Sequence, residues 1–325
     1  MKSAETVSLQ ITPSADPERV NTTTSTATNV ITTTSPNEYT PIGLINPSNH
    51  CYLNSVLQVL QRMLSCHTQN IHINDSSEGY IVEKFILCSN PRADLDMSFF
   101  KTLLTNTDDF FDGSRQRDAH ECFIKILDLF HIGTKENLIT CDGFPVDEEF
   151  TTSLTKQLLF FSLERTLLCL TCGKRDVSIT NLHSININPK QDVEFIDLIL
   201  DSLSSRIIKR CEFCCADTNH DELLLFQQLP NILCVVINRF DDSSNSRKND
   251  VFTYCNYDLK VQSTDYKLIG TVNHHGYSRL SGHYTSNVIF PGIKYCCNDG
   301  QITKSISKNV EVSNTAYIVL YAKSN

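Results

Sequence analysis

Cys51 is the first candidate for chemistry in this sequence, because an apolar pattern with the spacing of a helix begins directly after it. A thiol at the start of a helix faces the positive end of the helix dipole, which favours the reactive thiolate. The preceding residues 46–49, Asn-Pro-Ser-Asn, predict a turn whose backbone amides can point toward a developing oxyanion. Asn46 can offer its side-chain amide to the same place. A buried structural cysteine would share these features, so a nucleophile needs further support.

A nucleophilic thiol also needs a base, usually a histidine that an Asn or Asp side chain orients. His283 precedes a run of residues typical of a strand, and Asn298 and Asp299 follow that run after a Pro-Gly turn. A hairpin of this length would bring Asn298 beside His283, with Asp299 as the alternative partner. His274 and His275 lie in the same region, and spacing alone does not choose among the three histidines.

Two Cys-x-x-Cys pairs, Cys169 with Cys172 and Cys211 with Cys214, predict a metal site of four thiolates. The gap between the pairs exceeds the roughly 15–20 residues of common zinc ribbons, so the intervening segment must hold structure of its own. Cys215 is an alternative to Cys214 as a ligand. We expect one structural zinc ion per chain, with each pair at the tip of a hairpin.

Composition and charge narrow the class of protein. The 325 residues are 40% hydrophobic, which supports a folded core, and their formal net charge of −9 argues against nucleic-acid binding. No apolar run approaches the roughly 18 residues of a membrane span, and the N-terminus lacks the apolar core of a secretory signal. We therefore expect an intracellular protein of the cytoplasm, the nucleus or both, with no membrane partner. Its 14 Cys then serve metal binding or catalysis rather than disulfides.

The chain divides into a tail and a globular part. Residues 1–38 are rich in Thr and Ser and predict a disordered tail, whereas residues 39–325 predict one folded domain. Helical spacing dominates the first half, and short apolar runs typical of strands dominate the second. The segments are helices after Cys51, after Asp118 and over 191–203, and strands over 232–237, 266–272, 284–290 and 316–322. This order predicts an α+β fold with a mostly antiparallel sheet.

Six segments, in order along the chain, resemble the motifs of the ubiquitin-specific proteases. Ile42 to Ser55 resembles their Cys box, and Gln116 to Glu121 resembles their Gln-x-Asp-Ala-His-Glu segment. The two Cys-x-x-Cys pairs fall where that family carries zinc. Leu229 to Phe240 is similar to a family strand, Gly276 to Asp299 resembles the His box, and Ala316 to Tyr321 resembles its end.

The resemblance implies a papain-like cysteine protease fold with a helical thumb, an antiparallel β palm and zinc-bearing β fingers at approximately residues 160–235. It also implies which side chains do the chemistry. The implied roles are Cys51 as nucleophile, His283 as base, Asn298 (or Asp299) as the residue that orients the base, and Asn46 as oxyanion donor. His274 is then a structural neighbour of the base.

The resemblance further implies a deubiquitinase that hydrolyses the bond after the C-terminal Gly of ubiquitin. Asp118 and Glu121 match acidic positions that meet the ubiquitin tail, and the resemblance also places Gln116 and Tyr284 there. Residues 118 and 121 are three apart, on one helical face, and carboxylates bind the Arg side chains of that tail well. The helix dipole alone would also favour such an acidic pair. The expected partner is ubiquitin or its conjugates, and an activating protein is not identified by the sequence.

The sequence departs from the family pattern at four places. Ser48 stands where the family usually has Gly, His50 where it usually has Thr, and Cys122 where Phe is common. The Trp and Phe that usually precede the third catalytic residue are missing near Tyr295. The changes beside Cys51 keep two alternatives open. One is a catalytically weak module that binds ubiquitin, and the other is a protease for a ubiquitin-like modifier.

Overall fold

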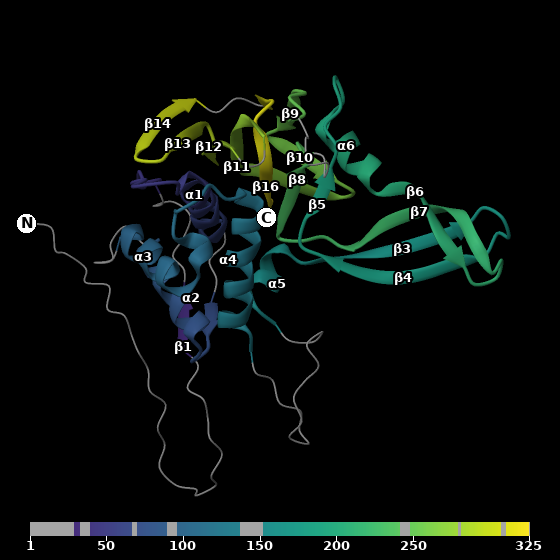
Figure 1. Ribbon diagram of the computed structural model, residues 1–325, viewed down its shortest axis with the longest axis horizontal. Helices are drawn as coiled ribbons and strands as arrows, with labels where there is room; N and C mark the ends of the chain where they lie inside the picture. Colours follow the sequence, from purple (N-terminus) through teal and green to yellow (C-terminus); the bar gives the residue numbers. More distant parts are fainter. Residues whose placement is uncertain are drawn as a thin grey trace, which may run out of the picture.

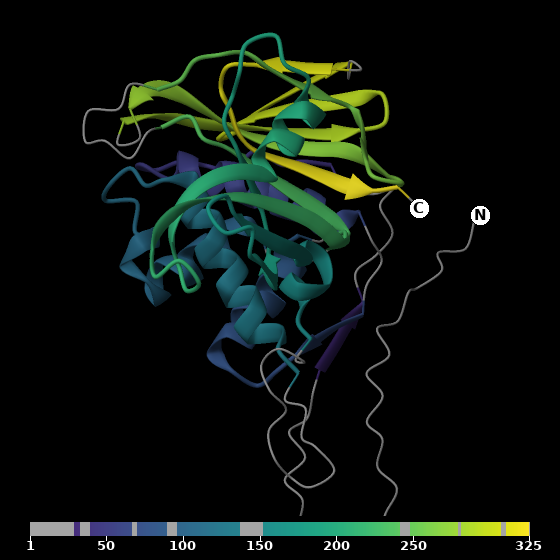
Figure 2. The same cartoon turned by 90° about the vertical axis from the view of Figure 1, so that its right-hand side faces the viewer.

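The computed structural model describes residues 29–32, 40–66, 70–89, 96–136, 152–240, 248–278, 281–306 and 310–324. Within these ranges a helical lobe and a large sheet form the body of the molecule, and a narrower sheet extends from one side as an arm (Figure 1). Figure 2 shows the large sheet lying over the helical lobe. None of the helices in the described ranges is long and apolar enough to cross a membrane.

The helical lobe comes from the first half of the chain. Its elements are α1 (Cys51–Ser65), α2 (Ser77–Cys88), α3 (Met97–Thr107), the 3-10 helix η1 (Asp109–Phe111), α4 (Ala119–Thr134) and α5 (Leu154–Leu159). The helix α1 is buried along nearly its whole length because it lies between α4 and the large sheet. Its polar side chains therefore bond to backbone carbonyls. Gln58 Nε2 donates to Ile42 O (2.6 Å), and Arg62 Nε donates to Ile289 O (3.0 Å).

The large sheet has the strand order β14-β13-β12-β11-β16-β8-β5, with β10 added beside β11. Its strands are β5 (Ile185–Ile187), β8 (Ile232–Ile237), β10 (Asp258–Val261), β11 (Thr264–Ser278), β12 (Ser281–Phe290), β13 (Ile293–Asn298), β14 (Gln301–Ile306) and β16 (Ala316–Lys323). All its described pairs are antiparallel except β5 with β8, which is parallel. The predicted α+β fold with a mostly antiparallel sheet is confirmed.

Both faces of this sheet are covered, which explains its apolar strands. In β8, Ile232, Cys234 and Val236 join the core against the helical lobe. Leu233, Val235 and Ile237 join a second core on the opposite face, which the helix α6 (Phe195–Ser202) also enters. A strand buried on both faces needs an apolar residue at every position, so residues 232–237 form an unbroken apolar run. A small pair of strands, β9 (Thr253–Asn256) and β15 (Val310–Ser313), borders the second core.

The arm is a four-stranded antiparallel sheet that lies between α5 and β8 in the chain. Its order is β4-β3-β7-β6, from β3 (Phe161–Cys169), β4 (Arg175–Leu182), β6 (Ser204–Cys211) and β7 (Ala216–Gln228). Each Cys-x-x-Cys pair lies at the turn of one hairpin, as predicted. Gly173 has a φ of +72° in the first of these turns, a conformation that glycine adopts without strain.

Part of the predicted disordered tail is ordered. Residues Asn29–Thr32 form β1, which pairs antiparallel with β2 (Asn70–Ile73). Ile31 packs against the main core, so one apolar residue among the threonines provides an anchor that the composition of the segment did not reveal. Residues 1–28 and 33–38 of the predicted tail lie outside the described residues. The helix predicted over 191–203 is shorter, because α6 begins at Phe195.

Candidate active site

Cys51 is the first residue of α1, and only 4% of its surface is exposed. The strand β12 runs beside α1, and the backbone of Tyr284 in that strand hydrogen-bonds the Cys51 thiol. Burial raises the pKa of this thiol, the hydrogen bond to Tyr284 lowers it, and the nearby charge of Asp299 raises it. The net direction is upward, opposite to the lowering of the thiol pKa that its position at the start of a helix suggested. The resting side chain is therefore a neutral thiol.

His283 lies in β12, directly before Tyr284, and its ring contacts Asn298 at the end of β13. The distance from His283 Nε2 to Asn298 Oδ1 is 2.7 Å, whereas Asp299 Oδ2 lies 4.0 Å from the same nitrogen. The predicted hairpin therefore does bring Asn298 beside His283. Because an amide oxygen only accepts hydrogen bonds, Nε2 carries the proton and Nδ1 remains the basic nitrogen.

Asp299 has a different set of partners from Asn298. Its carboxylate accepts hydrogen bonds from Asn46 Nδ2 (3.0 Å) and from Asn54 Nδ2 (2.7 Å). Its carbonyl oxygen accepts from the Leu44 N–H at 2.9 Å. Asp299 thus fastens the segment before Cys51 to the turn after β13. Asn54, one turn after Cys51 on α1, was missed from the sequence, although a polar residue within a buried helical stripe is a usable signal.

The side chain of Asn46 is fixed from both ends. Its Oδ1 accepts from the backbone N–H groups of Ser48 (3.3 Å) and His50 (2.9 Å), and its Nδ2 donates to Asp299. An amide nitrogen carries two hydrogens, so one remains for a further acceptor. The predicted Asn46 is therefore held close to the start of α1 with its amide nitrogen directed toward the turn that bears Asp299.

Of the three candidate histidines, only His283 contacts Asn298. His275 Nε2 lies 2.9 Å from Thr285 Oγ1. His274 is fully buried, and neither of its ring nitrogens has a hydrogen-bond partner in the described part of the chain. Burial, followed by the charge of Lys248, lowers the pKa of His274 to about 4, so the ring is neutral.

His274 lies beneath the turn that carries His283. A Cβ placed on Gly282 would lie 2.5 Å from His274 Nε2, so only glycine fits there. The rings of His274 and Tyr284 also lie with their centroids 4.7 Å apart. His274 therefore supports the backbone on either side of His283. The sequence had indicated only that His274 is a structural neighbour of the base.

Asp118 precedes α4 instead of lying on its face, which corrects the expectation for the acidic pair. Its carboxylate caps the helix by accepting from the His120 N–H at 2.7 Å, and it also accepts from the hydroxyl of Tyr317 (2.9 and 3.1 Å). Glu121 lies in the first turn of α4 and is exposed. Asp118 is thus held half-buried, whereas Glu121 is open to a cationic partner.

Gln116 and Tyr284 occupy opposite environments. The exposed Gln116 side chain exchanges two hydrogen bonds with the backbone of Gly282 (2.9 and 3.0 Å) and so links the helical lobe to the His283 turn. Tyr284 is only 3% exposed, and burial raises the pKa of its hydroxyl. The Tyr284 side chain is therefore buried, while its backbone lies beside the Cys51 thiol, and the predicted contact of Tyr284 with the ubiquitin tail stays a prediction.

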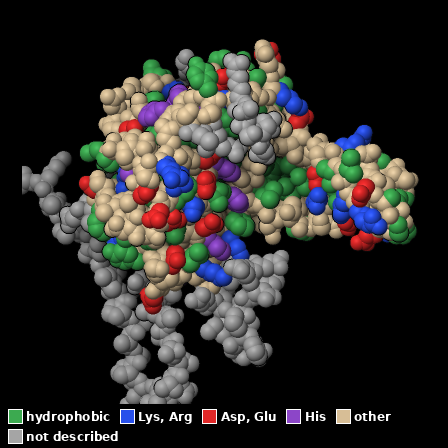
Figure 3. Space-filling model, in the orientation of Figure 1, with side chains coloured by type: hydrophobic (Ala, Val, Ile, Leu, Met, Phe, Trp, Pro, Cys, Tyr) green, Lys and Arg blue, Asp and Glu red, His purple; other side chains and the backbone are tan. Residues whose placement is uncertain are grey.

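An open hollow of about 490 Å³ lies where the arm meets the body. It is lined by His120 and Ile124 of α4, Leu163 and Leu224 of the arm, and residues 182–186 around the start of β5, among others. Figure 3 shows apolar side chains gathered at this junction. His120, which lies between Asp118 and Glu121 in the chain, is one of the lining residues, so the hollow reaches the first turn of α4.

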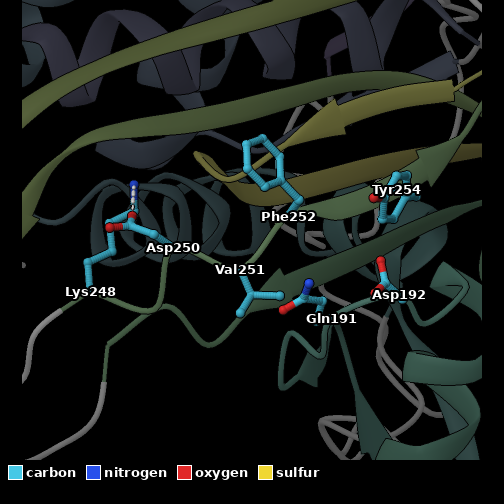
Figure 4. A pocket seen from close by; sticks show the side chains of 7 residues that line it. All are labelled: Gln191, Asp192, Lys248, Asp250, Val251, Phe252 and Tyr254. Atoms are coloured by element: carbon cyan, nitrogen blue, oxygen red, sulfur yellow. Dashed lines mark ion pairs between the residues drawn. The ribbon is translucent and has the colours of Figure 1, made fainter.

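A second hollow, of about 460 Å³, is separate from these residues (Figure 4). Its lining comes from Gln191, Asp192, Lys248, Asp250, Val251, Phe252 and Tyr254. The buried Arg239 fixes this loop by donating from NH1 to the carbonyls of Asn249 (3.0 Å) and Val251 (2.6 Å). None of the predicted catalytic residues lines this hollow, so the Arg239 segment has a structural role here.

Four thiols meet at the tip of the arm. The Sγ atoms of Cys169, Cys172, Cys211 and Cys214 all lie within 4.8 Å of one another. The Cys169–Cys214 and Cys172–Cys211 pairs lie at 3.9 and 3.7 Å, near the sulfur separation of about 3.8 Å that four Zn–S bonds of about 2.3 Å require. Cys215 instead contacts Glu212 O and is exposed. The structure therefore chooses Cys214, and the cluster fits a tetrahedral metal ion.

Comparison with known proteins gives a consistent result. A sequence profile described as ubiquitin carboxyl-terminal hydrolase matches residues 42–321. The chain is 29% identical over 322 residues to ubiquitin carboxyl-terminal hydrolase 25 of Arabidopsis thaliana, covering 88% of this chain and 48% of that protein. It is 26% identical to human ubiquitin carboxyl-terminal hydrolase 2, covering 86% and 54%. The chain thus spans about half the length of these relatives.

Solved structures agree with the fold. One, described as the SAGA Ubp8/Sgf11/Sus1/Sgf73 DUB module bound to ubiquitin aldehyde, is similar with a TM-score of 0.65 at 20% identity, covering 88% of this chain and 70% of that chain. The same module bound to monoubiquitin gives a TM-score of 0.66, also at 20% identity, covering 91% and 71%. At this identity the likeness establishes the fold.

Proposed function

Because the chain belongs to the ubiquitin carboxyl-terminal hydrolase family, we propose that it is a thiol-dependent deubiquitinase that hydrolyses the bond after the C-terminal Gly of ubiquitin. The observation that carries the proposal is the meeting of three segments at one place. The backbone next to His283 bonds the Cys51 thiol, Asn298 orients the His283 ring, and the Asp299 turn holds Asn46. Relatives that are ubiquitin carboxyl-terminal hydrolases, and a structural neighbour that binds ubiquitin aldehyde, support ubiquitin as the substrate.

The resting thiol determines the first chemical step. Since Cys51 is neutral, His283 Nδ1 takes its proton as the sulfur attacks the terminal Gly carbonyl. The second Asn46 amide hydrogen stabilises the oxyanion, an interaction worth on the order of 10² in rate. His283 then protonates the leaving amine, which leaves a thioester on Cys51. A water molecule that gives its proton to His283 attacks this thioester and releases ubiquitin and the free thiol.

The surface around the site suits the tail and body of ubiquitin. The exposed Glu121 and the half-buried Asp118 offer carboxylates to cationic side chains near the scissile bond. The apolar hollow between α4 and the arm follows directly and can take apolar side chains of the same substrate. Charge and apolar surface are therefore arranged in the order in which an extended, cationic tail would meet them.

We propose that the four thiols of the arm hold a structural zinc ion. Cys169, Cys172, Cys211 and Cys214 would be its ligands, and the ion would lock the two hairpin turns together. With four protein ligands there is no open coordination position, which makes the role structural and places it apart from the chemistry.

Hydrolysis of a ubiquitin C-terminal fluorophore substrate tests the proposed function. We expect activity in the wild type, none in Cys51→Ala, and undiminished ubiquitin binding by that variant, because removal of one sulfur leaves the surface in place. The matched control is Cys215→Ser, which removes an exposed thiol outside the cluster and should retain full activity. Hydrolysis by Cys51→Ala at the wild-type rate would overturn the proposal, as would wild-type protein that binds ubiquitin but never cleaves it.

A further inference from the structure

His50, the residue before the nucleophile, is buried and bonded on both sides of its ring. It is 7% exposed and occupies the N-cap position of α1, yet its side chain makes no capping bond to the helix. Its Nε2 lies 3.0 Å from Phe111 O, and its Nδ1 lies 3.3 Å from Ser48 Oγ. The ring therefore points away from α1 and toward the segment that follows η1.

The first of these contacts places a proton on Nε2 of the ring, because the Phe111 carbonyl only accepts hydrogen bonds. In the neutral ring Nδ1 is then an acceptor, and the Ser48 hydroxyl is its donor. Burial lowers the pKa of His50, as does the charge of Lys101 on α3, while the Phe111 bond and the charges of Asp112 and Asp299 oppose this.

The neighbouring segment is shaped to receive the ring. Gly113 has a φ of +69°, and a Cβ placed on it would lie 2.4 Å from both His50 Cε1 and Ser48 Oγ. Asn49 Nδ2 also donates to Gly113 O at 3.1 Å. The side chains of Asn49 and His50 are thus bonded to residues 111–113, and the side chain of Ser48 is bonded to the His50 ring. No side chain larger than that of glycine fits at position 113 without displacing them.

The same three residues carry the backbone that holds Asn46. The N–H groups of Ser48 and His50 are the two donors to Asn46 Oδ1. Any movement of residues 48–50 would therefore rotate the Asn46 amide away from its bond to Asp299 and from the oxyanion. The side chains of Ser48 and His50 fix these donors from one side, and Asp299 fixes the Asn46 amide from the other.

We propose that Ser48 and His50 form a side-chain clip that positions the oxyanion-binding loop of residues 46–51. The clip rests on the proposed roles of Cys51 and Asn46. It acts on them through the backbone, so both members are positioning residues that do not touch the reacting atoms. Ser48 and His50 stand where the family usually has Gly and Thr. In this proposal the two changes compensate one another, because the contact between the two side chains keeps the loop ordered.

A set of four variants tests the clip in the full chain. His50→Ala should lower kcat about 10-fold with little change in KM, since oxyanion stabilisation is worth on the order of 10² and only its alignment is disturbed. His50→Gln should restore most of the rate, because its amide can donate to Phe111 O and accept from Ser48. Ser48→Ala should cause a smaller loss, and the double variant His50→Ala with Ser48→Ala should be no slower than His50→Ala alone. Ser114→Ala is the matched control in the neighbouring loop and should behave as wild type.

Capture by ubiquitin that bears a C-terminal alkyne separates the clip from the nucleophile. Addition of a thiol to an alkyne forms no oxyanion, so His50→Ala should be captured at nearly the wild-type rate while its hydrolysis is slow. Wild-type protein that is neither captured nor active would mean that the proposed function itself fails. With an active wild type, normal kcat in both His50→Ala and Ser48→Ala would overturn the clip. Additive losses in the double variant, or a raised KM with unchanged kcat, would also overturn it.

Discussion

The His283 ring is oriented by a neutral amide, and the neighbouring carboxylate serves another side chain. Asn298 Oδ1 lies 2.7 Å from the ring, while Asp299 bonds Asn46 and Asn54. Two adjacent residues of one tight turn therefore support the base and the oxyanion donor separately. The sequence indicated that one of the two orients His283, but it could not divide these tasks because both side chains can accept a hydrogen bond.

Asn298→Ala should lower kcat by about 10²-fold, because the proton of His283 is then no longer fixed on Nε2. Asn298→Asp is the matched variant and should keep much of the activity, since a carboxylate oxygen accepts the same bond. Steady-state hydrolysis of the fluorophore substrate measures both. Equal rates for Asn298→Ala and the wild type would assign the orienting role to another residue.

Buried His274 should make folding sensitive to acid. Its pKa falls from 6.5 to about 4 in the folded protein, so between these values the unfolded chain binds more protons. The stabilisation is complete above pH 6.5 and is lost as the pH falls toward 4, by about 3 kcal/mol in total. In His274→Leu, which does not titrate, the free energy of unfolding measured in urea should fall less steeply over this range. Parallel pH profiles for variant and wild type would contradict the assignment.

At the scale of elements, the periodicity of apolar residues predicted helices and strands well in segments where one pattern dominates. The strand at 232–237 was expected because its apolar run is unbroken. The helix after Cys51 was expected because its apolar residues recur every three or four positions. Two predictions missed for identifiable reasons. Val30 and Ile31 lie among threonines that predict disorder, and Asp118 looks like a helix residue although it is the cap. The order of residues 29–32 comes from pairing with a strand far away in the chain, which a short sequence window does not contain.

Removal of metal should affect the arm selectively. Because the proposed ion would join the two hairpin turns through four thiols, a chelator or the variant Cys172→Ser should loosen the tip and weaken ubiquitin capture. The body, with its own two cores, should retain its secondary structure. Elemental analysis should find one zinc per wild-type chain and one in Cys215→Ser, but less in Cys172→Ser. Folded wild-type protein that contains no metal would contradict the proposed zinc site.

At the scale of the whole molecule, the site exists only because three parts of the chain converge. The helical lobe supplies Cys51 at the end of a buried helix, and the sheet supplies His283 and Asn298 on neighbouring strands. The arm borders the hollow that leads to them. The candidate residues were visible in the sequence through their motifs. The buried thiol and the clip at His50 were not, because each depends on segments more than 50 residues apart, such as Cys51 and Tyr284 or His50 and Phe111.

The most direct test of the account is to react the protein with ubiquitin that carries a C-terminal electrophile and to map the modified residue by mass spectrometry. We predict one adduct per chain, located on Cys51 although the chain has 14 Cys, and no adduct in Cys51→Ala. An adduct on any other cysteine, or an unmodified Cys51 in folded protein that binds ubiquitin, would contradict the claim that this thiol is the nucleophile.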